Sequence, residues 1–433
     1  MRFFKTLFPA LLIIILIASP SSSTNQTPDS AGVKGPKVIY RPLESGMLEP
    51  VEDELPPLPV IKLKNKTYRN KIVAVQVLLF DCETMAAVEQ RIIKLKKSGV
   101  NTLIFRVFHN KGDRFYPFAA AKNSRGVYFK SRNAPIVDDI LGDVANIAHQ
   151  NDMDIYAWMT TRYANYGVEG KREWQGRGYD LNSRQYSKIK GLNLFNRDAK
   201  NHIISIYKDL AAYDIDGILF QDDLVLKHTE GFSNDARMAY SKEHSRAPDP
   251  DKFYRSTFRN NAGREIVMSY GEDFWDWSRW KNRALLGVAK EIMDNVRVIN
   301  PDMKFAINLM YEAAIKPKEA LAWLSQDLDE AVKTGFDLYA IMAYHRQIGE
   351  ELGIKDSSLD AVMGELTANT IKKVGDPDKA LIKLQIADWR DNRKLPYEEM
   401  RRFMKILRDN GATSYAFVPY YDDFDFRKLA RNM

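Results

Sequence analysis

Two adjacent carboxylates, Asp222 and Asp223, are the residues of this sequence best placed to do chemistry. They end the run DGILFQDD (216–223), in which apolar residues lead directly into the acidic pair. Neighbours on a β-strand point to opposite sides, so one carboxylate is expected to face a cleft. Glycosidic cleavage needs such groups: one carboxylic acid protonates the leaving oxygen, while a second charge supports the oxocarbenium-like transition state or activates water. The alternative is that the pair caps the next segment or binds a backbone amide.

The second charge has three candidates, Asp81, Glu312 and Asp388, each at the end of a predicted strand. Each of them could instead position a ligand or play a structural part. The separation of the two carboxylates decides between retention and inversion, and sequence spacing does not give that separation. The stereochemical outcome therefore stays open, and Asp222 is preferred over Asp223 as the acid only weakly.

Other polar side chains also follow apolar runs, where a barrel enzyme can aim them at its ligand. The whole set comprises Asp81, His109, Arg162, Asp222, Asp223, Asn308, Tyr311, Tyr344, His345, Asp388, Arg390, Asp422 and Asp423. Trp389, in LQIADWR (384–390), could stack on a sugar ring or pack beneath its loop. The segment FWDWSRW (274–280) suits a loop entering a helix, with at least one tryptophan in the core.

Several other chemistries are disfavoured by the same sequence. The six histidines form no HxxxH pair and have no cysteine partner, so a zinc or iron centre is not expected. No glycine-rich phosphate loop and no GxSxG elbow occurs. The formal net charge of +7 is spread over 433 residues, too diffusely for a nucleic-acid-binding surface. The single cysteine, Cys82, is expected to be structural, and we expect no metal and no other cofactor.

The elements that must position these residues follow from an alternation of short apolar runs with longer amphipathic stretches. This alternation is typical of a parallel sheet covered by helices, whose strands are buried on both faces. The eight runs are Val73–Phe80, Thr102–Phe108, Asp154–Met159, Gly217–Phe220, Lys304–Met310, Asp337–Tyr344, Leu381–Ile386 and Ser414–Val418. Eight strands close a (β/α)8 TIM barrel, although an open doubly wound sheet would give the same local pattern. We expect an α/β fold with the barrel over residues 71–433.

The sequence predicts helices most clearly over Met85–Lys97, which Gly99 ends, and over Ala199–Ala212. Two connections are long, Thr160–Asn193 after the third strand and Leu224 to about Trp280 after the fourth. Loops that follow barrel strands lie on the catalytic face, so these two are expected to wall the cleft.

The first 70 residues differ in composition from the rest. Arg2 and Lys5 precede an apolar run of about eleven residues and then small residues, which is the layout of a secretory signal peptide over residues 1–23. The run is shorter than the roughly 20 residues that a membrane span needs. Residues 24–70 contain seven prolines and read as an extended linker. The protein is therefore expected to be periplasmic or secreted.

Four ordered motifs resemble the C-terminal glycoside-hydrolase domain of PgaB-type poly-β-1,6-N-acetyl-D-glucosamine deacetylases. They are DGILFQDDLVL (216–226), WSRWKNRAL (277–285), KLQIADWR (383–390) and YYDDF (420–424), and YAWM (156–159) and FDLYAIMAY (336–344) also fit. The resemblance covers nearly the whole chain after residue 70. It implies a barrel that binds and hydrolyses partially de-N-acetylated poly-β-1,6-glucosamine, with Asp222 and Asp223 at its active site.

Substrate-binding residues are expected partly from the resemblance, which carries over the strand-seven motif, and partly from position at a strand end. They are Asp81, Trp158, Asn308, Tyr344, Asp388, Trp389, Arg390, Asp422 and Asp423. The acids among them would attract the ammonium groups of deacetylated glucosamine and repel anionic polymers.

Two departures from the relatives matter. The metal-dependent deacetylase domain is not expected, because its His and Asp metal motif is not found in residues 24–70. Gln221 stands before the aspartate pair, where His is expected in the relatives. We predict a monomeric glycoside hydrolase without deacetylation. The alternatives are a non-catalytic carbohydrate-binding barrel that assists exopolysaccharide export machinery, and a hydrolase of another amino-sugar glycan.

Overall fold

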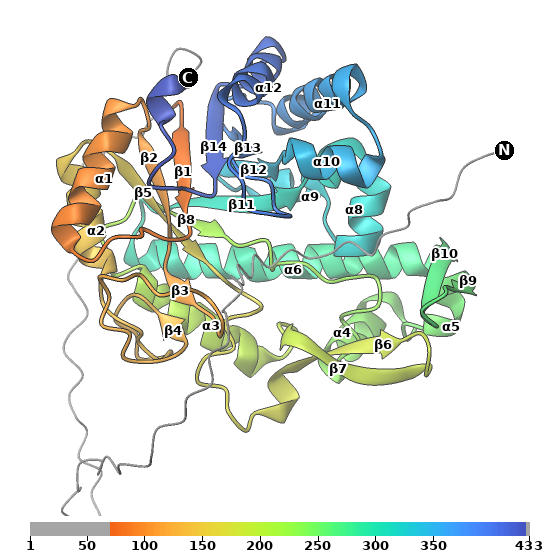
Figure 1. Ribbon diagram of the computed structural model, residues 1–433. Coiled ribbons are helices and arrows are strands. Elements are labelled where there is room, and N and C mark those ends of the chain that lie inside the picture. The colour runs from red at the N-terminus through yellow and green to blue at the C-terminus, as the bar shows by residue number, and fades with distance from the viewer. Residues whose placement is uncertain (1–69, 430–433) are drawn as a thin grey trace, which may run out of the picture.

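Eight parallel strands close into a barrel, in the order β1-β14-β13-β12-β11-β8-β5-β2 (Figure 1). The computed structural model describes residues 70–429. The expected signal peptide, and all of the expected linker except its last residue, lie outside the described residues. The barrel strands are β1 (Val73–Val77), β2 (Thr102–Arg106), β5 (Asp154–Met159), β8 (Gly217–Phe220), β11 (Lys304–Met310), β12 (Leu338–Met342), β13 (Ala380–Gln385) and β14 (Ser414–Val418). The predicted α/β TIM-barrel fold is confirmed, and every barrel strand falls within or beside a predicted run.

The strands are buried on both faces, which explains their continuous apolar character. All five residues of β1, β2, β12 and β14 are buried. The exceptions to apolarity are inward-facing polar residues near the strand ends, such as Gln76, Arg106 and Lys383, which line a cleft inside the barrel mouth.

Helices surround the barrel and cover its outer face (Figure 1). They include α1 (Met85–Lys97), α2 (Leu141–Gln150), α3 (Arg197–Leu210), α6 (Glu272–Ile299), α8 (Pro317–Leu324), α9 (Leu328–Thr334), α11 (Asp356–Val374) and α12 (Tyr397–Asp409). The Thr84 side chain caps α1 by accepting from the Ala87 amide, and Asn196 caps α3 through the amides of Asp198 and Ala199. Side-chain oxygens at these positions satisfy amides that the first turn leaves unpaired. Helix α1 has the predicted bounds, and α3 begins and ends two residues before the prediction.

The two long connections fold into structured insertions. The segment after β5 contains the hairpin β6 (Gln175–Asp180) and β7 (Gln185–Leu192). The segment after β8 contains α4 (Asn234–His244), α5 (Pro250–Phe253) and a second hairpin, β9 (Tyr254–Arg259) with β10 (Glu265–Tyr270). Figure 1 shows both insertions beside the first half of α6.

The insertions share an aromatic core with α6, separate from the barrel core. Its buried members are Phe232, Ala236, Tyr240, Phe253, Phe274, Trp277, Trp280 and Ala322. The segment 274–280 therefore lies in the first turns of α6 and not in a loop, and two of its tryptophans, Trp277 and Trp280, are buried in this core.

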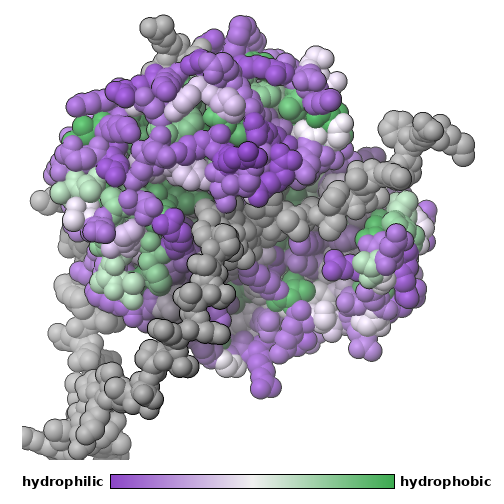
Figure 2. All heavy atoms as spheres, in the orientation of Figure 1, coloured by the Kyte–Doolittle hydropathy of each residue, from purple (hydrophilic) through white to green (hydrophobic). Residues whose placement is uncertain are grey.

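The surface of the described residues is mostly hydrophilic in the face that Figure 2 shows, with small hydrophobic areas that include the region of the β9–β10 hairpin. Among the large apolar side chains of residues 70–429, the exposed ones are Tyr186, Met238, Phe258, Met268, Val298 and Ile299. Over the same residues, no helix combines the length and the hydropathy that crossing a membrane requires.

Candidate active site

A cleft of ≈ 930 Å³ opens at the C-terminal ends of the barrel strands. This is the end at which TIM-barrel enzymes place their active sites. Every barrel strand, or the loop that follows it, contributes to the wall. The lining residues are Gln76, Leu78, Arg106, Phe108, Asn110, Asp113, Trp158, Gln221, Asp222, Asn308, Met310, Tyr311, Met342, Tyr344, Gln347, Lys383, Trp389 and Val418.

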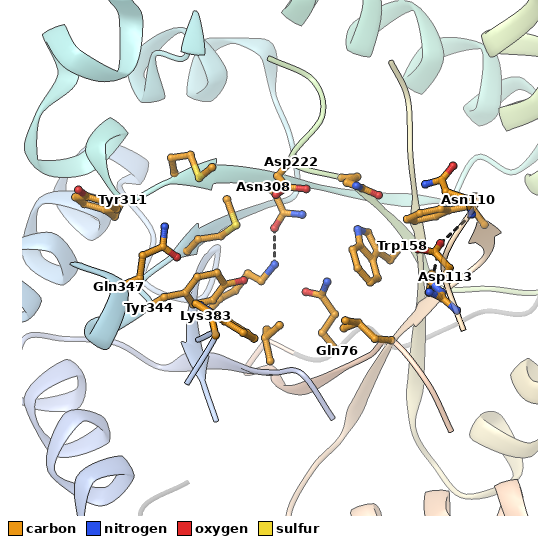
Figure 3. Close-up of a pocket in the computed structure, with 18 residues that line it drawn as sticks. Gln76, Asn110, Asp113, Trp158, Asp222, Asn308, Tyr311, Tyr344, Gln347 and Lys383 are labelled. Carbon is orange, nitrogen blue, oxygen red and sulfur yellow. Dashed lines mark hydrogen bonds and ion pairs between the residues drawn. The ribbon is translucent and has the colours of Figure 1, made fainter. Parts of the chain in front are cut away.

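Figure 3 shows an elongated site with polar residues along its length. One end holds Asn110, Asp113 and Trp158, and the other holds Tyr311, Tyr344 and Gln347. The middle is formed by Asp222, Asn308, Lys383 and Gln76.

Asp222 is the carboxylate at the centre of the cleft. It follows β8 by two residues and is partly buried. Burial raises the pKa of Asp222 above its ordinary value, the Lys383 charge opposes that rise, and the Asp223 charge adds to it. A carboxyl group with a raised pKa holds its proton at a pH where an ordinary carboxylate has lost it, which is what a general acid requires.

Asp223 has a different environment, although it is the next residue. It is fully buried and does not line the cleft. Its carboxylate accepts bonds from Thr160 Oγ1 at 2.7 Å and from the Tyr163 amide at 2.7 Å, and both of its oxygens accept from the Thr161 amide. Asp223 thereby fixes the first turn of the long connection after β5.

A chain of hydrogen bonds crosses the cleft floor beside Asp222. Lys383 Nζ donates to Asn308 Oδ1 at 2.7 Å, and Asn308 Nδ2 donates to the Phe220 carbonyl at 3.0 Å. The chain joins β13 to β11 and then to the last residue of β8. Both side chains are buried, and burial lowers the pKa of Lys383.

Four buried polar atoms in the cleft wall have no hydrogen-bond partner among the described residues. They are Gln76 Oε1, Arg106 Nε, Trp158 Nε1 and Gln221 Oε1. Buried polar groups are nearly always hydrogen-bonded, so these atoms are free to bind the hydroxyl or amide groups of a ligand.

Aromatic side chains give the cleft apolar surfaces for sugar rings. Trp158 packs edge-on against Phe108 with ring centroids 5.4 Å apart, and Trp389 packs edge-on against Tyr344 at 5.3 Å. Trp389 is only partly buried and lines the cleft. Its position favours contact with a ligand over packing beneath the loop.

Of the residues predicted from sequence, the cleft brings together Trp158, Asp222, Asn308, Tyr311, Tyr344 and Trp389. Asp81, Asp422 and Asp423 line a second cleft with Tyr420 and Tyr421. Leu78, Arg106 and Asp113 line both clefts, so the two are continuous.

The three predicted acids of the second cleft all have basic partners, as does Asp113, which pairs with Arg106. Asp81 pairs with Arg114 at 3.2 Å, Asp422 with Arg91 at 3.0 Å, and Asp423 with Lys394. Asp81 and Asp423 are largely exposed, so their charges are available to a ligand at modest cost.

Asp388 and Arg390 do not line either cleft. Asp388 is buried, and the hydrogen bonds that it accepts from Arg390 at 2.6 Å and from Arg346 at 3.0 Å hold its pKa well below the usual range. These contacts brace the loop that carries Trp389. Glu312, the remaining candidate for the second charge, is also buried outside the clefts, and burial raises its pKa to about 7.

Sequence reasoning missed several cleft residues, notably Gln76, Arg106, Asp113 and Lys383. Gln76, Arg106 and Lys383 are polar residues inside apolar strands (VAVQV, TLIFR and ALIKLQ), and that mismatch is the signal that could have found them. Asp113 lies in the loop after β2, where it accepts from the Asn110 amide at 2.8 Å and faces Arg106 at 3.5 Å. The expectation that the two long connections wall this cleft is wrong: no residue of 160–193 or 224–280 lines it, and the insertions bury their aromatic residues against α6 instead.

Across residues 70–429, no group of three or more His, Cys, Asp or Glu side chains is arranged to hold a metal ion.

A closed parallel barrel with an acid and aromatic rings at the C-terminal ends of its strands is an architecture typical of the glycosyl hydrolases. The chain belongs to the hypothetical glycosyl hydrolase family 13, whose model matches residues 85–420.

The chain is also similar to curated and solved relatives of one kind. It is 28% identical over 309 residues to the poly-β-1,6-N-acetyl-D-glucosamine N-deacetylase of Escherichia coli strain K12, covering 68% of this chain and 42% of that protein. The chain thus spans less than half the length of that relative. The structure of the PgaB (BpsB) glycoside hydrolase domain from Bordetella bronchiseptica matches with a TM-score of 0.66 and 25% identity, covering 84% of this chain and 99% of that one. The predicted resemblance is confirmed.

More distant structures share the fold alone. The catalytic domain of β-amylase from Paenibacillus polymyxa matches with a TM-score of 0.54 and 9% identity, covering 84% of this chain and 98% of that chain.

Proposed function

We propose that this protein is a glycoside hydrolase that cleaves partially de-N-acetylated poly-β-1,6-N-acetylglucosamine, with Asp222 as the general acid. The observation that carries the proposal is the Asp222 carboxyl, which lines the cleft at the end of β8 and whose pKa is raised by burial. In this role Asp222 gives its proton to the glycosidic oxygen as the bond to the anomeric carbon breaks, and water adds its oxygen to that carbon and releases a proton. Membership of a glycosyl hydrolase family supports the reaction class.

The substrate class is supported by two features of the clefts. Trp158 and Trp389 offer ring faces or edges to sugars, and the unpartnered atoms of Gln76 and Arg106 can bind their substituents. The second cleft carries the acidic residues Asp81 and Asp423, which attract the ammonium of a deacetylated glucosamine. Similarity to a poly-β-1,6-N-acetyl-D-glucosamine N-deacetylase points to the same polymer.

The linkage and sugar are tested by product release from defined oligomers. Chromatography of digests of β-1,6-glucosamine oligomers and of galactosamine oligomers, each partially acetylated, should show shortening of the first and not of the second. Cleavage of the galactosamine oligomers alone would contradict the proposed substrate and would still support a glycoside hydrolase.

A carbohydrate-binding barrel without catalysis is the second candidate. It is favoured by the surroundings of Asp113, which is the other carboxylate among the described cleft-lining residues and is paired with Arg106. A paired acid is poorly suited to act as a base or nucleophile. Gln221, at the position before the acids, adds no titrating group. Tight oligomer binding by the wild-type protein without any product would favour this candidate.

We further propose that the protein acts as a monomer in the periplasm or outside the cell, beside exopolysaccharide export machinery, and without a metal. The layout of residues 1–23 supports export. Intact-mass measurement of the exported protein should show a start near Ser22, and retention of Met1 would contradict cleavage. Treatment with EDTA should leave glycan cleavage unchanged, and a loss of activity that zinc restores would contradict metal independence.

A further inference from the structure

Lys383 is a buried cation beside the acid, and its position is unusual for a lysine. It lies on β13, its side chain lines the cleft, and only 1% of the residue is exposed. Lysine is almost never fully buried unless it is paired, and an unpaired buried charge is costly. The arrangement therefore needs a partner for the ammonium group.

Asn308 binds the ammonium directly, and Asp222 lies beyond Asn308 in the same cleft. Asn308 Oδ1 accepts from Lys383 Nζ at 2.7 Å, and the amide is held in this orientation because Asn308 Nδ2 donates to the Phe220 carbonyl. An ammonium has three donors, and this bond uses one. The Asp222 charge opposes the burial that lowers the pKa of Lys383, and the Lys383 charge opposes the burial that raises the pKa of Asp222. Figure 3 shows Asn308 between Asp222 and Lys383.

The geometry points to a role for Lys383 in the proposed reaction. We propose that Lys383 is a positioning residue: its buried ammonium, held at the cleft floor by Asn308, supplies the charge that balances the Asp222 carboxyl. This inference rests on the proposed function, and it assigns to Lys383 an effect on Asp222, the proposed general acid.

The other groups near Asp222 act from different elements. Asp223 lies next to it in the chain and raises its pKa, and burial raises it further, so Lys383 is the basic group that opposes both. Tyr344, which follows β12, is partly buried and lines the cleft, and burial together with the Asp222 charge raises its pKa. Arg106 and Asp113 line the cleft from β2 and its following loop and are paired with each other. Removing the Lys383 charge should therefore raise the Asp222 pKa.

Lys281 provides a matched control. It is also fully buried, and burial lowers its pKa. Its ammonium donates to the carbonyls of Lys227 at 2.9 Å and Glu230 at 3.2 Å, within the insertion after β8. It does not line the cleft. A change that removes this lysine disturbs folding in a comparable way without touching Asp222.

The test compares Lys383→Gln, Lys383→Met and Lys281→Met in the full chain. Lys383→Gln keeps a hydrogen-bond donor for Asn308 and removes the charge, whereas Lys383→Met removes the donor and the charge. Either variant alone can test the inference if the other fails to fold. Two readouts are followed: the Asp222 carboxyl titration by ¹³C NMR, assigned with Asp222→Asn, and the pH profile of kcat/KM on the glucosamine oligomers. Both Lys383 variants should move the titration and the alkaline limb upward by about one pH unit, equivalent to a tenfold change in proton affinity. Lys281→Met should move neither.

The two readouts separate this inference from the proposed function. A shifted titration in a protein that cleaves no oligomer would keep the role of Lys383 in adjusting Asp222 and remove the proposed hydrolysis. An Asp222 titration that is the same in wild type and in a folded Lys383 variant would overturn the inference, whatever the activity.

Discussion

Asp222 and Asp223 are both carboxylates, but their surroundings differ. They follow the end of β8, where one side opens to the cleft and the other packs against the connection after β5. Asp222 lines the cleft, whereas Asp223 is fully buried and holds the backbone of the connection after β5. Replacement of Asp223 is therefore expected to lower stability, whereas replacement of Asp222 is expected to lower activity.

Asp223→Ala should lower the free energy of unfolding by roughly 3 kcal/mol or more, because it leaves the buried donors of Thr160, Thr161 and Tyr163 without an acceptor. Urea denaturation followed by fluorescence measures the loss. Asp222→Ala is the comparison and should cost clearly less, because the Asp222 carboxyl faces the open cleft. Equal and small effects of the two changes would contradict the structural role of Asp223.

Sequence reasoning identified the acidic pair but could not separate its members. Strand alternation requires that one of two neighbours faces the cleft, yet the parity is lost once the chain leaves β8 at Phe220. Lys383 was missed for another reason: it sits inside the apolar run LIKLQI, where its burial depends on Asn308 and Asp222, residues 75 and 161 positions away. Contacts of that kind have no local signature.

At the scale of elements, the barrel strands were predictable and the insertions were not. Barrel strands are buried on both faces, so each reads as an apolar run with a clear beginning and end. The hairpin strands β7 and β9 are mostly exposed and rich in polar residues, as in QYSKIKGL (185–192) and YRSTFR (254–259), and resemble loops in sequence. Their order comes from the shared aromatic core on α6.

That aromatic core should carry much of the stability of the insertions. Trp277 is fully buried between Phe232, Tyr240 and Trp280. Trp277→Ala should lower the free energy of unfolding by about 3–5 kcal/mol, because it removes a large buried ring and leaves a cavity. Near-ultraviolet circular dichroism combined with urea titration measures this.

Trp275 is the control for the change, since it lies in the same turns of α6 and is only partly buried. Trp275→Ala should cost clearly less. If Trp277→Ala proved as mild as Trp275→Ala, the insertions would not depend on this core.

At the scale of the whole molecule, the net charge is positive, whereas the second cleft gathers acidic residues. The formal net charge is +7, while acidic residues gather in the second cleft at the barrel mouth. A local acidic region in a mildly basic protein can attract a cationic polymer to the cleft without making the whole surface acidic.

Two histidines, the buried His109 and the partly buried His228, make the stability of the fold sensitive to acid. Burial lowers the pKa of both His109 and His228 from the ordinary value of 6.5 to about 4. Because the folded-state pKa is the lower one, the unfolded chain takes up protons first, and stability is lost as the pH falls from about 6.5 towards 4.

The comparison of wild type with His228→Gln isolates one such contribution. Glutamine can keep a polar contact with Tyr270, the hydroxyl partner of His228 at 2.9 Å, and does not titrate. The thermal midpoint should fall more between pH 7.5 and pH 5 in the wild type than in the variant. Parallel changes in the two proteins would contradict a His228 that is neutral in the folded state.

The central claim, that Asp222 is the acid of a glycoside hydrolase, is tested most directly by oligomer cleavage in Asp222→Asn. The substrate is a partially de-N-acetylated β-1,6-N-acetylglucosamine oligomer of defined length, and the measurement is kcat/KM from chromatographic product release. We predict that the wild type shortens the oligomer, and that Asp222→Asn loses at least about 10²-fold in rate while it unfolds at the same urea concentration. A folded Asp222→Asn protein that cleaves at nearly the wild-type rate would contradict the account.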